Sequence, residues 1–256
     1  MAQAGTQSVH LPGPDSTGRV LNFRNPNNSP AIGASMWQGF DVLAANADPA
    51  YSHVFFDDFH SLATAADTWI ETAATSGTIV AGVKAGGVAT FDAGAATDGQ
   101  GPQQQLAGVD FFPAAGKTLW YECRVNPLVF ITGDFFFGLA ELDTTIIASS
   151  DMTTANHIGF SCFTGDGILL CDANKATVRV ATTAATTLVA ATYVKLGFIV
   201  NGVTSITFYV NGVANATTIA TASIPVVGLT PSFSVHATGT DQQLMNVDYV
   251  KVAQLR

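Results

Sequence analysis

Charged side chains are scarce in this chain. Only 11% of its 256 residues are Asp, Glu, Lys or Arg, against roughly 25% in an average soluble protein. Much of the surface must therefore be Thr, Ser, Asn, Gln, Gly and Ala, which suits packing against other proteins. Ten Lys and Arg stand against nineteen Asp and Glu, so the net charge is −9. This charge repels phosphate backbones and anionic membrane surfaces, and we expect neither nucleic acid nor a membrane as a partner.

Long apolar runs are also missing. No stretch approaches the roughly 20 apolar residues of a membrane-spanning helix. Met1 to His10 contain neither a basic cluster nor an apolar segment, so we expect no export by a signal peptide.

Cysteine is rare, and its number is odd: Cys123, Cys162 and Cys171 all lie in strand-like apolar segments. A hairpin between Cys162 and Cys171, with its turn at Gly165 and Asp166, would pair Cys162 with Leu169, which leaves the two thiols out of register. We expect three reduced, buried thiols, as in a protein made in a cytoplasm.

Proline-rich sequence marks residues 1–50, which include an Asn-Pro-Asn-Asn-Ser-Pro stretch. Such sequence favours extended and turn conformations, and it predicts an arm instead of a folded layer. Exposing its large apolar side chains to water would be unfavourable, so we expect the arm to lie on its own domain or on a neighbouring subunit. The predicted partner-binding residues of the arm are Leu21, Phe23, Ile32, Met36, Trp37 and Phe40.

Short apolar runs separated by Gly, Asn, Asp and Thr fill residues 51–256 and predict a β-sandwich domain. Asn-Gly pairs at 201–202 and 211–212 follow alternating segments, so the stretch Tyr193 to Thr218 is predicted to be a β-meander. Ser61 to Thr75 is Ala-rich and fits a short helix, but its β-branched threonines favour a strand or loop nearly as well.

Trp120 is singled out by the alternation of Leu119 to Val125. Leu119, Tyr121, Cys123 and Val125 form one face, and Trp120 falls on the other with Glu122 and Arg124. A large aromatic on the polar face of a strand indicates a contact. We therefore predict that Trp120 either binds a neighbouring subunit or is covered by the arm.

Glu141 and Asp143 form the sharpest catalytic candidate. On a strand, residues two apart share a face, and two such carboxylates suit the acid and the nucleophile of a glycosidase. The third acid of the laminarinase-like pattern Glu-x-Asp-x-x-Glu is missing, because Thr144, Thr145 and Ile146 follow. We therefore expect solvated acids at a strand end, and not an enzyme.

Metal and cofactor motifs are absent. Asp57 and Asp58 are adjacent, so on a strand they face opposite ways, and we expect a backbone contact instead of a calcium site. The histidines show no ligand spacing, and no phosphate-binding or dinucleotide-binding pattern occurs. Trp37, Trp69 and Trp120 are candidates for a sugar-stacking platform, although burial in a core or interface is more common for tryptophan. No cofactor and no metal is expected.

Three segments together resemble the concanavalin A-like, laminin G-like jelly roll. They are Phe55-Phe56-Asp57-Asp58-Phe59, Phe208-Tyr209-Val210-Asn211-Gly212 and the closing Val247-Asp248-Tyr249-Val250-Lys251-Val252. The resemblance implies an all-β fold, an antiparallel two-sheet jelly-roll sandwich over 51–256 behind the extended arm of 1–50. This fold hosts lectins, hydrolases and virion proteins alike.

The arm followed by an aromatic-Asp-Asp-Phe opening also looks like head decoration proteins of tailed bacteriophages. That resemblance implies a homotrimeric capsid decoration (cement) protein on the exterior of the virion, bound to the major capsid protein through its arm. The alternative hypothesis is a lectin-like, carbohydrate-binding module of a phage tail or surface, with a surface glycan as partner. A glycosidase that uses Glu141 and Asp143 is the third.

Overall fold

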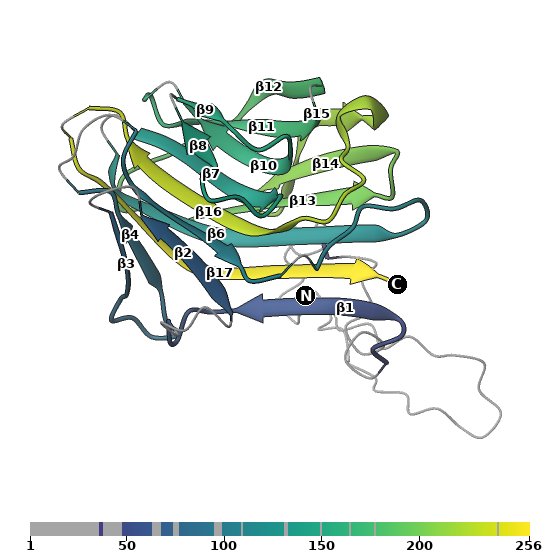
Figure 1. The fold of residues 1–256 in the computed structure, drawn as a ribbon, viewed down its shortest axis with the longest axis horizontal. Coiled ribbons are helices and arrows are strands. Elements are labelled where there is room, and N and C mark those ends of the chain that lie inside the picture. Colours follow the sequence, from purple (N-terminus) through teal and green to yellow (C-terminus); the bar gives the residue numbers. More distant parts are fainter. Residues whose placement is uncertain are drawn as a thin grey trace, which may run out of the picture.

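Two stacked antiparallel sheets make up the computed structural model of the chain (Figure 1). The structure describes residues 36–37, 48–62, 68–73, 77–94, 99–108, 110–130, 133–148, 150–163, 165–176, 178–239 and 241–256. Its one helical element in these ranges is the 3-10 turn η1 (Thr221–Ser223). Within the same ranges, no helix has the length and apolar character needed to cross a membrane.

Sheet A has eight strands. In spatial order, seven of them are β15 (Val213–Ala220), β14 (Ser205–Val210), β13 (Val194–Asn201), β6 (Thr118–Phe130), β17 (Gln243–Leu255), β4 (Ala89–Asp92) and β3 (Thr78–Ala81). The eighth, β1 (Ser52–Asp57), pairs with β17, so the opening and closing strands lie side by side (Figure 1).

Sheet B has seven strands. Their order is β12 (Val178–Thr187), β11 (Ile168–Lys175), β10 (Asn156–Cys162), β7 (Gly133–Ala140), β16 (Thr230–Ala237), β5 (Pro102–Leu106) and β2 (Trp69–Ala73). The short strands β8 (Ile147–Ala148) and β9 (Asp151–Met152) form a separate two-stranded ribbon between β7 and β10.

The core fills the space between the two sheets with aromatic and branched side chains. The ring centroids of Phe59, Trp69, Phe91 and Phe137 all lie within 6.5 Å of that of Phe233. Aromatic pairs at such separations stabilise a core beyond their buried area. The all-β, two-sheet sandwich expected from the sequence is confirmed.

The meander predicted over Tyr193 to Thr218 is also confirmed, as β13, β14 and β15. Asn211 and Gly212 both adopt positive φ, 52° and 80°, the conformation that tight hairpin turns require and that Asn and Gly tolerate. In contrast, Trp69–Ala73 is the strand β2, so the helical alternative for Ser61 to Thr75 is wrong there. Packing of Trp69 in the core outweighs the high helix propensity of the neighbouring alanines, because tertiary contacts override such local preferences. The division at residue 50 stays a prediction.

All three cysteines are buried free thiols, as expected. Phe160 lies opposite Cys171 and Ser161 opposite Leu170, a register that keeps Cys162 and Cys171 apart. Burial raises the pKa of Cys123 and of Cys171 to about 12. Both side chains therefore remain protonated core residues.

Candidate functional site on the outer face of sheet B

The outer face of sheet B, which points away from the core, is polar and yet buried. A polar sheet face normally meets water, but none of the side chains named below is more than 3% exposed. The set comprises Gln103, Gln105, Asp134, His157, Ser161, Asp172, Ser232, Ser234 and His236.

Residues 141–148 and 150–155, here called the covering hairpin, contain β8 and β9 (Figure 1) and contact this face. Two glutamines of β5 hold its backbone. Gln105 donates from Nε2 to the Glu141 carbonyl at 2.9 Å and accepts the Asp143 N–H at 2.8 Å. Gln103 repeats the pattern with the Asp143 carbonyl at 2.8 Å and the Ile146 N–H at 2.7 Å. The side-chain amides of Gln103 and Gln105 thus hydrogen-bond the hairpin backbone as the backbone of a neighbouring strand would.

Phe136 lies flat on the centre of the outer face. A Cβ at Gly138 would come within 3.0 Å of its ring, and a Cβ at Gly159 within 2.9 Å, so only a glycine pair lets the ring rest on the sheet. Ile146 and Ile147 of the covering hairpin pack in the same apolar cluster. Phe136 is therefore an aromatic platform, and the hairpin covers the side of its ring that points away from the sheet.

A row of side chains crosses five strands through this platform. The register places Asp172 opposite Gly159, Gly159 opposite Gly138, Gly138 opposite Ser232 and Ser232 opposite Gln105. At about 4.8 Å per strand the row spans about 19 Å. It is long enough for a chain molecule lying across the strands.

One end of the row carries an ionic network. Asp172 accepts hydrogen bonds from Ser161 Oγ at 2.6 Å and from Arg179 at 2.7 and 3.1 Å. The Nε2 atom of His157 lies 3.2 Å from the same carboxylate. Arg179 also pairs with Asp151 of the covering hairpin. A single guanidinium thus joins the hairpin to the sheet.

The network keeps Asp172 ionised. Burial alone would raise its pKa, but hydrogen bonds from His157 and Arg179, together with their charge, outweigh burial and lower the pKa to about 2. Asp172 is therefore a fixed negative charge at neutral pH and cannot serve as a proton donor there.

A second polar cluster lies beside the row, on β16 and β7. His236 lies opposite Asp134 in the register of β16 and β7, and burial lowers the pKa of His236 to about 4. Within the described part of the chain, neither Nδ1 of His236 nor Oγ of Ser234 has a hydrogen-bond partner. Buried polar atoms usually have partners, so these two atoms are available to a ligand.

Glu141 and Asp143 do not share a strand face, so the geometry assumed for a catalytic pair is wrong. β7 ends at Ala140, and both acids belong to the covering hairpin. Asp143 accepts the Thr145 N–H at 3.1 Å, which turns the chain. The backbone groups of Glu141 and Asp143, which bond Gln103 and Gln105, fix the hairpin to the sheet.

Asp57 bonds the backbone and the core, as expected. Its carboxylate accepts the Phe59 N–H and the Trp69 indole N–H, both at 2.7 Å. Trp69 is thereby fixed in the core, away from Trp37 and Trp120, so the three tryptophans do not form one platform. Among the described residues, no three His, Cys, Asp or Glu side chains gather as a metal site requires.

Met36, Trp37 and Trp120 meet on the outer face of sheet A. Trp37 donates its indole N–H to Glu122 at 3.2 Å, and Lys251 Nζ lies 4.1 Å from its ring centroid. Met36 packs with Trp120 in one buried cluster. Of the two alternatives for Trp120, the structure shows cover by the arm. Leu21, Phe23, Ile32 and Phe40 lie outside the described residues, and partner binding by any of the seven stays a prediction.

Replacing Gly197 with alanine should dislodge Met36. An added Cβ would stand 2.4 Å from Met36 Sδ and 2.8 Å from the Tyr121 carbonyl, so the arm must give way. We expect a loss of about 1 to 3 kcal/mol in the free energy of unfolding. We also expect faster trypsin cleavage after Arg24, which precedes Met36 in the arm. Val213→Ala, a change at an exposed residue of the same sheet, serves as the control; equal cleavage of both variants would contradict the contact.

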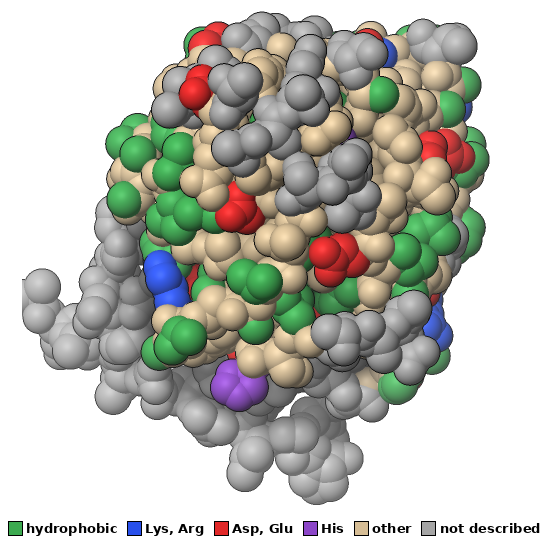
Figure 2. All heavy atoms as spheres, turned by 60° about the vertical axis from the view of Figure 1, so that its left-hand side comes forward, with side chains coloured by type: hydrophobic (Ala, Val, Ile, Leu, Met, Phe, Trp, Pro, Cys, Tyr) green, Lys and Arg blue, Asp and Glu red, His purple; other side chains and the backbone are tan. Residues whose placement is uncertain are grey.

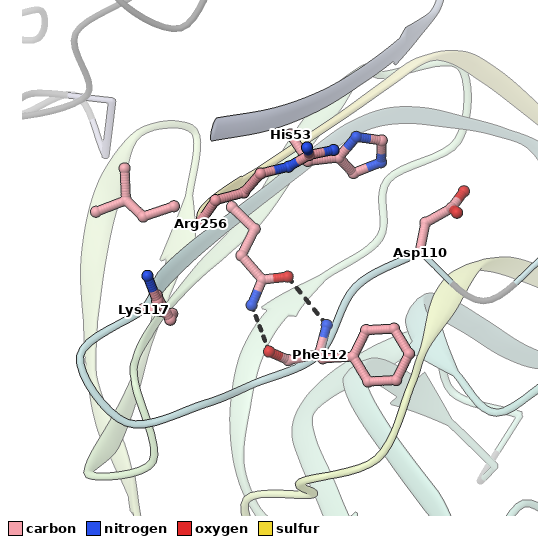
Figure 3. Close-up of a pocket in the computed structure, with 7 residues that line it drawn as sticks. His53, Asp110, Phe112, Lys117 and Arg256 are labelled. Atoms are coloured by element: carbon pink, nitrogen blue, oxygen red, sulfur yellow. Dashed lines mark hydrogen bonds between the residues drawn. The ribbon is translucent and has the colours of Figure 1, made fainter. Parts of the chain in front are cut away.

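A shallow pocket of about 330 Å³ lies where β1 begins and β17 ends (Figure 3). His53, Lys117 and Arg256 line it with one carboxylate, Asp110. Gln254 also lines the pocket, and its side chain accepts the Phe112 N–H at 2.9 Å. Its described lining offers neither two carboxylates nor an extended row, so the outer face of sheet B is the stronger candidate.

Solved structures similar to this chain share its architecture. No protein-family model and no curated protein matches the sequence. A protein of unknown function from Shewanella oneidensis MR-1 matches with a TM-score of 0.57 at 9% identity, over 80% of this chain and 87% of that one. A glycoside hydrolase family 16 endo-glucanase from Bacteroides ovatus matches with a TM-score of 0.54 at 11% identity, over 77% and 99%. An endo-β-1,3-glucanase from Pyrococcus furiosus matches with 0.55 at 12%, over 79% and 94%.

The fold is the concanavalin A-like jelly roll. The sequence resemblance to that fold is therefore confirmed. The structures reported above lend no support to a capsid or virion role.

The expectation that the chain is not an enzyme is contradicted, because structures that share its jelly roll are glycoside hydrolases. That expectation rested on a missing acid after Glu141 and Asp143. These residues lie in the covering hairpin, so the missing acid gives no information about catalytic residues on the strands of the jelly roll.

The outer-face residues had a signal in the sequence that the search for acid pairs missed. In Asn156–Cys162, His157, Gly159 and Ser161 alternate with Ile158, Phe160 and Cys162. This alternation marks a second, polar face of a core strand. The covering hairpin had no comparable signal.

Proposed function

We propose that the chain is a carbohydrate-binding jelly roll that binds a β-linked glucan across the outer face of sheet B. The observation that carries this proposal is the platform of Phe136 on its glycine pair, set in a row of amide and hydroxyl side chains. Sugar rings bind through apolar contact with aromatic faces and through hydrogen bonds of their hydroxyls. Gln103, Gln105, Ser232 and Ser234 supply the hydrogen-bonding groups.

The charge of the molecule favours a neutral ligand. Figure 2 shows a surface made mostly of uncharged side chains, with Asp and Glu standing apart. A net charge of −9 repels polyanions outside locally cationic surfaces, but it imposes no penalty on a neutral glucan. The names of the endo-glucanases that share the fold indicate the same class of ligand.

The covering hairpin sets the condition for binding. Its backbone occupies the amide groups of Gln103 and Gln105, and its isoleucines cover Phe136. A glucan must displace it, and the apparent affinity falls by the fraction of molecules in which the hairpin is open. We therefore expect weak binding by the wild-type chain.

Titration with β-1,3- and β-1,4-linked gluco-oligosaccharides, followed by calorimetry, tests the proposal. Phe136→Leu keeps an apolar contact for the hairpin but removes the flat ring, and it should weaken binding by roughly tenfold, the effect of about 1.4 kcal/mol. Phe112→Leu, a change at a half-exposed phenylalanine of the shallow pocket, should leave binding unchanged. Equal affinities of the two variants would refute the site.

Hydrolysis of the bound glucan is a second candidate function, favoured by the glycoside hydrolases that share the fold. A glycosidase needs two carboxyl groups about 5 to 9.5 Å apart. Asp134 and Asp172 are separated by two strand spacings and four residues along the strands, about 16 Å, so they are not such a pair. Asp172 would need a second carboxylate from the displaced hairpin, such as Asp151, which pairs with the same arginine, Arg179. New reducing ends in the titrated samples, absent with Asp172→Asn, would establish hydrolysis.

Capsid decoration remains a prediction from the arm alone. Binding to a major capsid protein, a homotrimer and a place on the exterior of a virion have no support in the comparisons. The docking of Met36 and Trp37 on their own domain does not require a capsid. Co-sedimentation with a phage particle would be needed to revive this hypothesis.

A further inference from the structure

A second surface, on sheet A, gathers cations and aromatic rings. The strands β1, β17, β6 and β13 lie next to one another there (Figure 1), and Lys84 of the loop between β3 and β4 contacts Tyr193, which directly precedes β13. The surface, here called the cationic patch, consists of Phe56, Lys84, Arg124, Tyr193, Lys195 and Tyr249.

Contacts across the strands hold the patch together. Arg124 lies 4.0 Å from the ring centroid of Tyr193, and Lys84 donates to the Tyr193 hydroxyl at 3.0 Å. The register places Arg124 opposite both Lys195 and Tyr249. The ring of Phe56 lies 6.4 Å from that of Tyr249. Elements distant in the sequence therefore build one continuous surface.

The patch is open to ligands. Phe56 is 58% exposed, the Arg124 side chain is 40% exposed, and Lys84 is exposed. Contact of an exposed aromatic ring and two half-exposed tyrosines with water is unfavourable, and such contiguous apolar surface marks interaction sites. It indicates a site that is covered by a flat, partly apolar ligand.

The charge of the patch is opposite to that of the whole chain. Arg124 is paired with Asp248 at 2.7 Å. Lys84 and Lys195 have no ion-pair partner among the described residues. Two unpaired ammonium groups attract carboxylates, but they are too few for nucleic acid, which typically engages about six to ten phosphates. The patch fits a ligand of lower charge density than nucleic acid.

We propose that the cationic patch binds a polysaccharide that carries carboxylate groups, such as a uronic acid polymer. Phe56 and Tyr249 contact the sugar rings, while Lys84 and Lys195 bind carboxylates. This site is independent of the proposed glucan site on sheet B, because it lies on the opposite outer face of the sandwich.

Affinity electrophoresis in gels that contain sodium polygalacturonate tests this proposal. Wild-type migration should be retarded. Lys195→Gln should weaken binding by roughly tenfold or more, as expected for a lost charge-assisted contact, and Phe56→Ala should weaken it through the lost contact of its ring with the sugar. Raising NaCl from 50 to 500 mM should weaken wild-type binding. Lys175→Gln, on β11 of the other sheet, is the matched control.

Several results would overturn the proposal. They are no retardation of the folded wild-type chain, an equal loss with Lys175→Gln, and concentration-dependent association of copies that Lys195→Gln abolishes, since the patch would then be a self-contact. Neutral β-glucan binding should be unchanged by Lys195→Gln, and polygalacturonate binding unchanged by Phe136→Leu. The two sites therefore fail or succeed separately.

Discussion

Replacing Arg179 with methionine should lower the free energy of unfolding by about 3 to 5 kcal/mol at pH 7, as removal of one partner from a buried ion pair does. The reason is the carboxylate left behind. Asp172 is fully buried and relies on two hydrogen bonds from Arg179. Urea denaturation measures the loss.

A matched ion pair on the other sheet provides the control. Arg124 bonds Asp248 at 2.7 Å with a side chain that is 40% exposed, and Arg124→Met should cost no more than about 1 kcal/mol. Adding Asp172→Asn to the Arg179 variant should recover part of the loss, since a neutral amide is less costly to bury. Similar losses for the two arginine variants would show that burial of Asp172 has no special effect.

The pH dependence of the Arg179 effect follows from Asp172. The pKa of this carboxyl is lowered from 3.8 to about 2 in the folded chain, so its stabilisation is complete above about pH 4. It is lost as the pH falls through 2. The difference in the free energy of unfolding between wild type and Arg179→Met should therefore be largest at pH 7 and should disappear as the pH falls to about 2.

Loosening the covering hairpin should raise the apparent affinity for β-linked gluco-oligosaccharides by at least about tenfold. Ile146→Ser combined with Ile147→Ser removes two buried apolar side chains from the hairpin, each contributing roughly 1.5 to 3 kcal/mol, and leaves the outer face of sheet B unchanged. The population with an open hairpin rises, and the apparent affinity rises with it.

The control for the hairpin variant changes two exposed valines of sheet A, Val80→Ser and Val213→Ser. These residues lie away from the covering hairpin, and their replacement should leave calorimetric affinity unchanged. A hairpin variant that stays folded and binds no more tightly than wild type would show that the hairpin does not block the site.

Much of the fold was predictable because its signals are local. The Asn-Gly pairs at the ends of β13 and β14 provide the positive φ of Gly202, Asn211 and Gly212, and the alternation in Leu119 to Val125 separates the core from the outer face. For Trp120 the sequence left two alternatives, contact with a neighbouring subunit or cover by the arm. The choice between them required the docking of Met36 at Gly197, a contact between residues 161 positions apart.

The candidate site was less predictable because long-range contacts create it. Nothing in Gln103-Gln104-Gln105 signals that two of the three amides hold the backbone of residues 141–146. Arg179 and Asp172 lie on neighbouring strands, and only the folded register shows that their ion pair also reaches Asp151. Short motifs direct attention to adjacent acids, whereas the face combines residues from six strands.

Hydrogen exchange of the covering hairpin during glucan binding tests the proposed function most directly. The amides of Asp143, Ile146 and Thr153 are hydrogen-bonded in the closed hairpin, and their exchange should accelerate when gluco-oligosaccharides are added at saturation. Amides of the β13 to β15 meander should be unaffected. Unchanged or slower exchange of the three hairpin amides, with glucan demonstrably bound, would contradict binding on the outer face of sheet B.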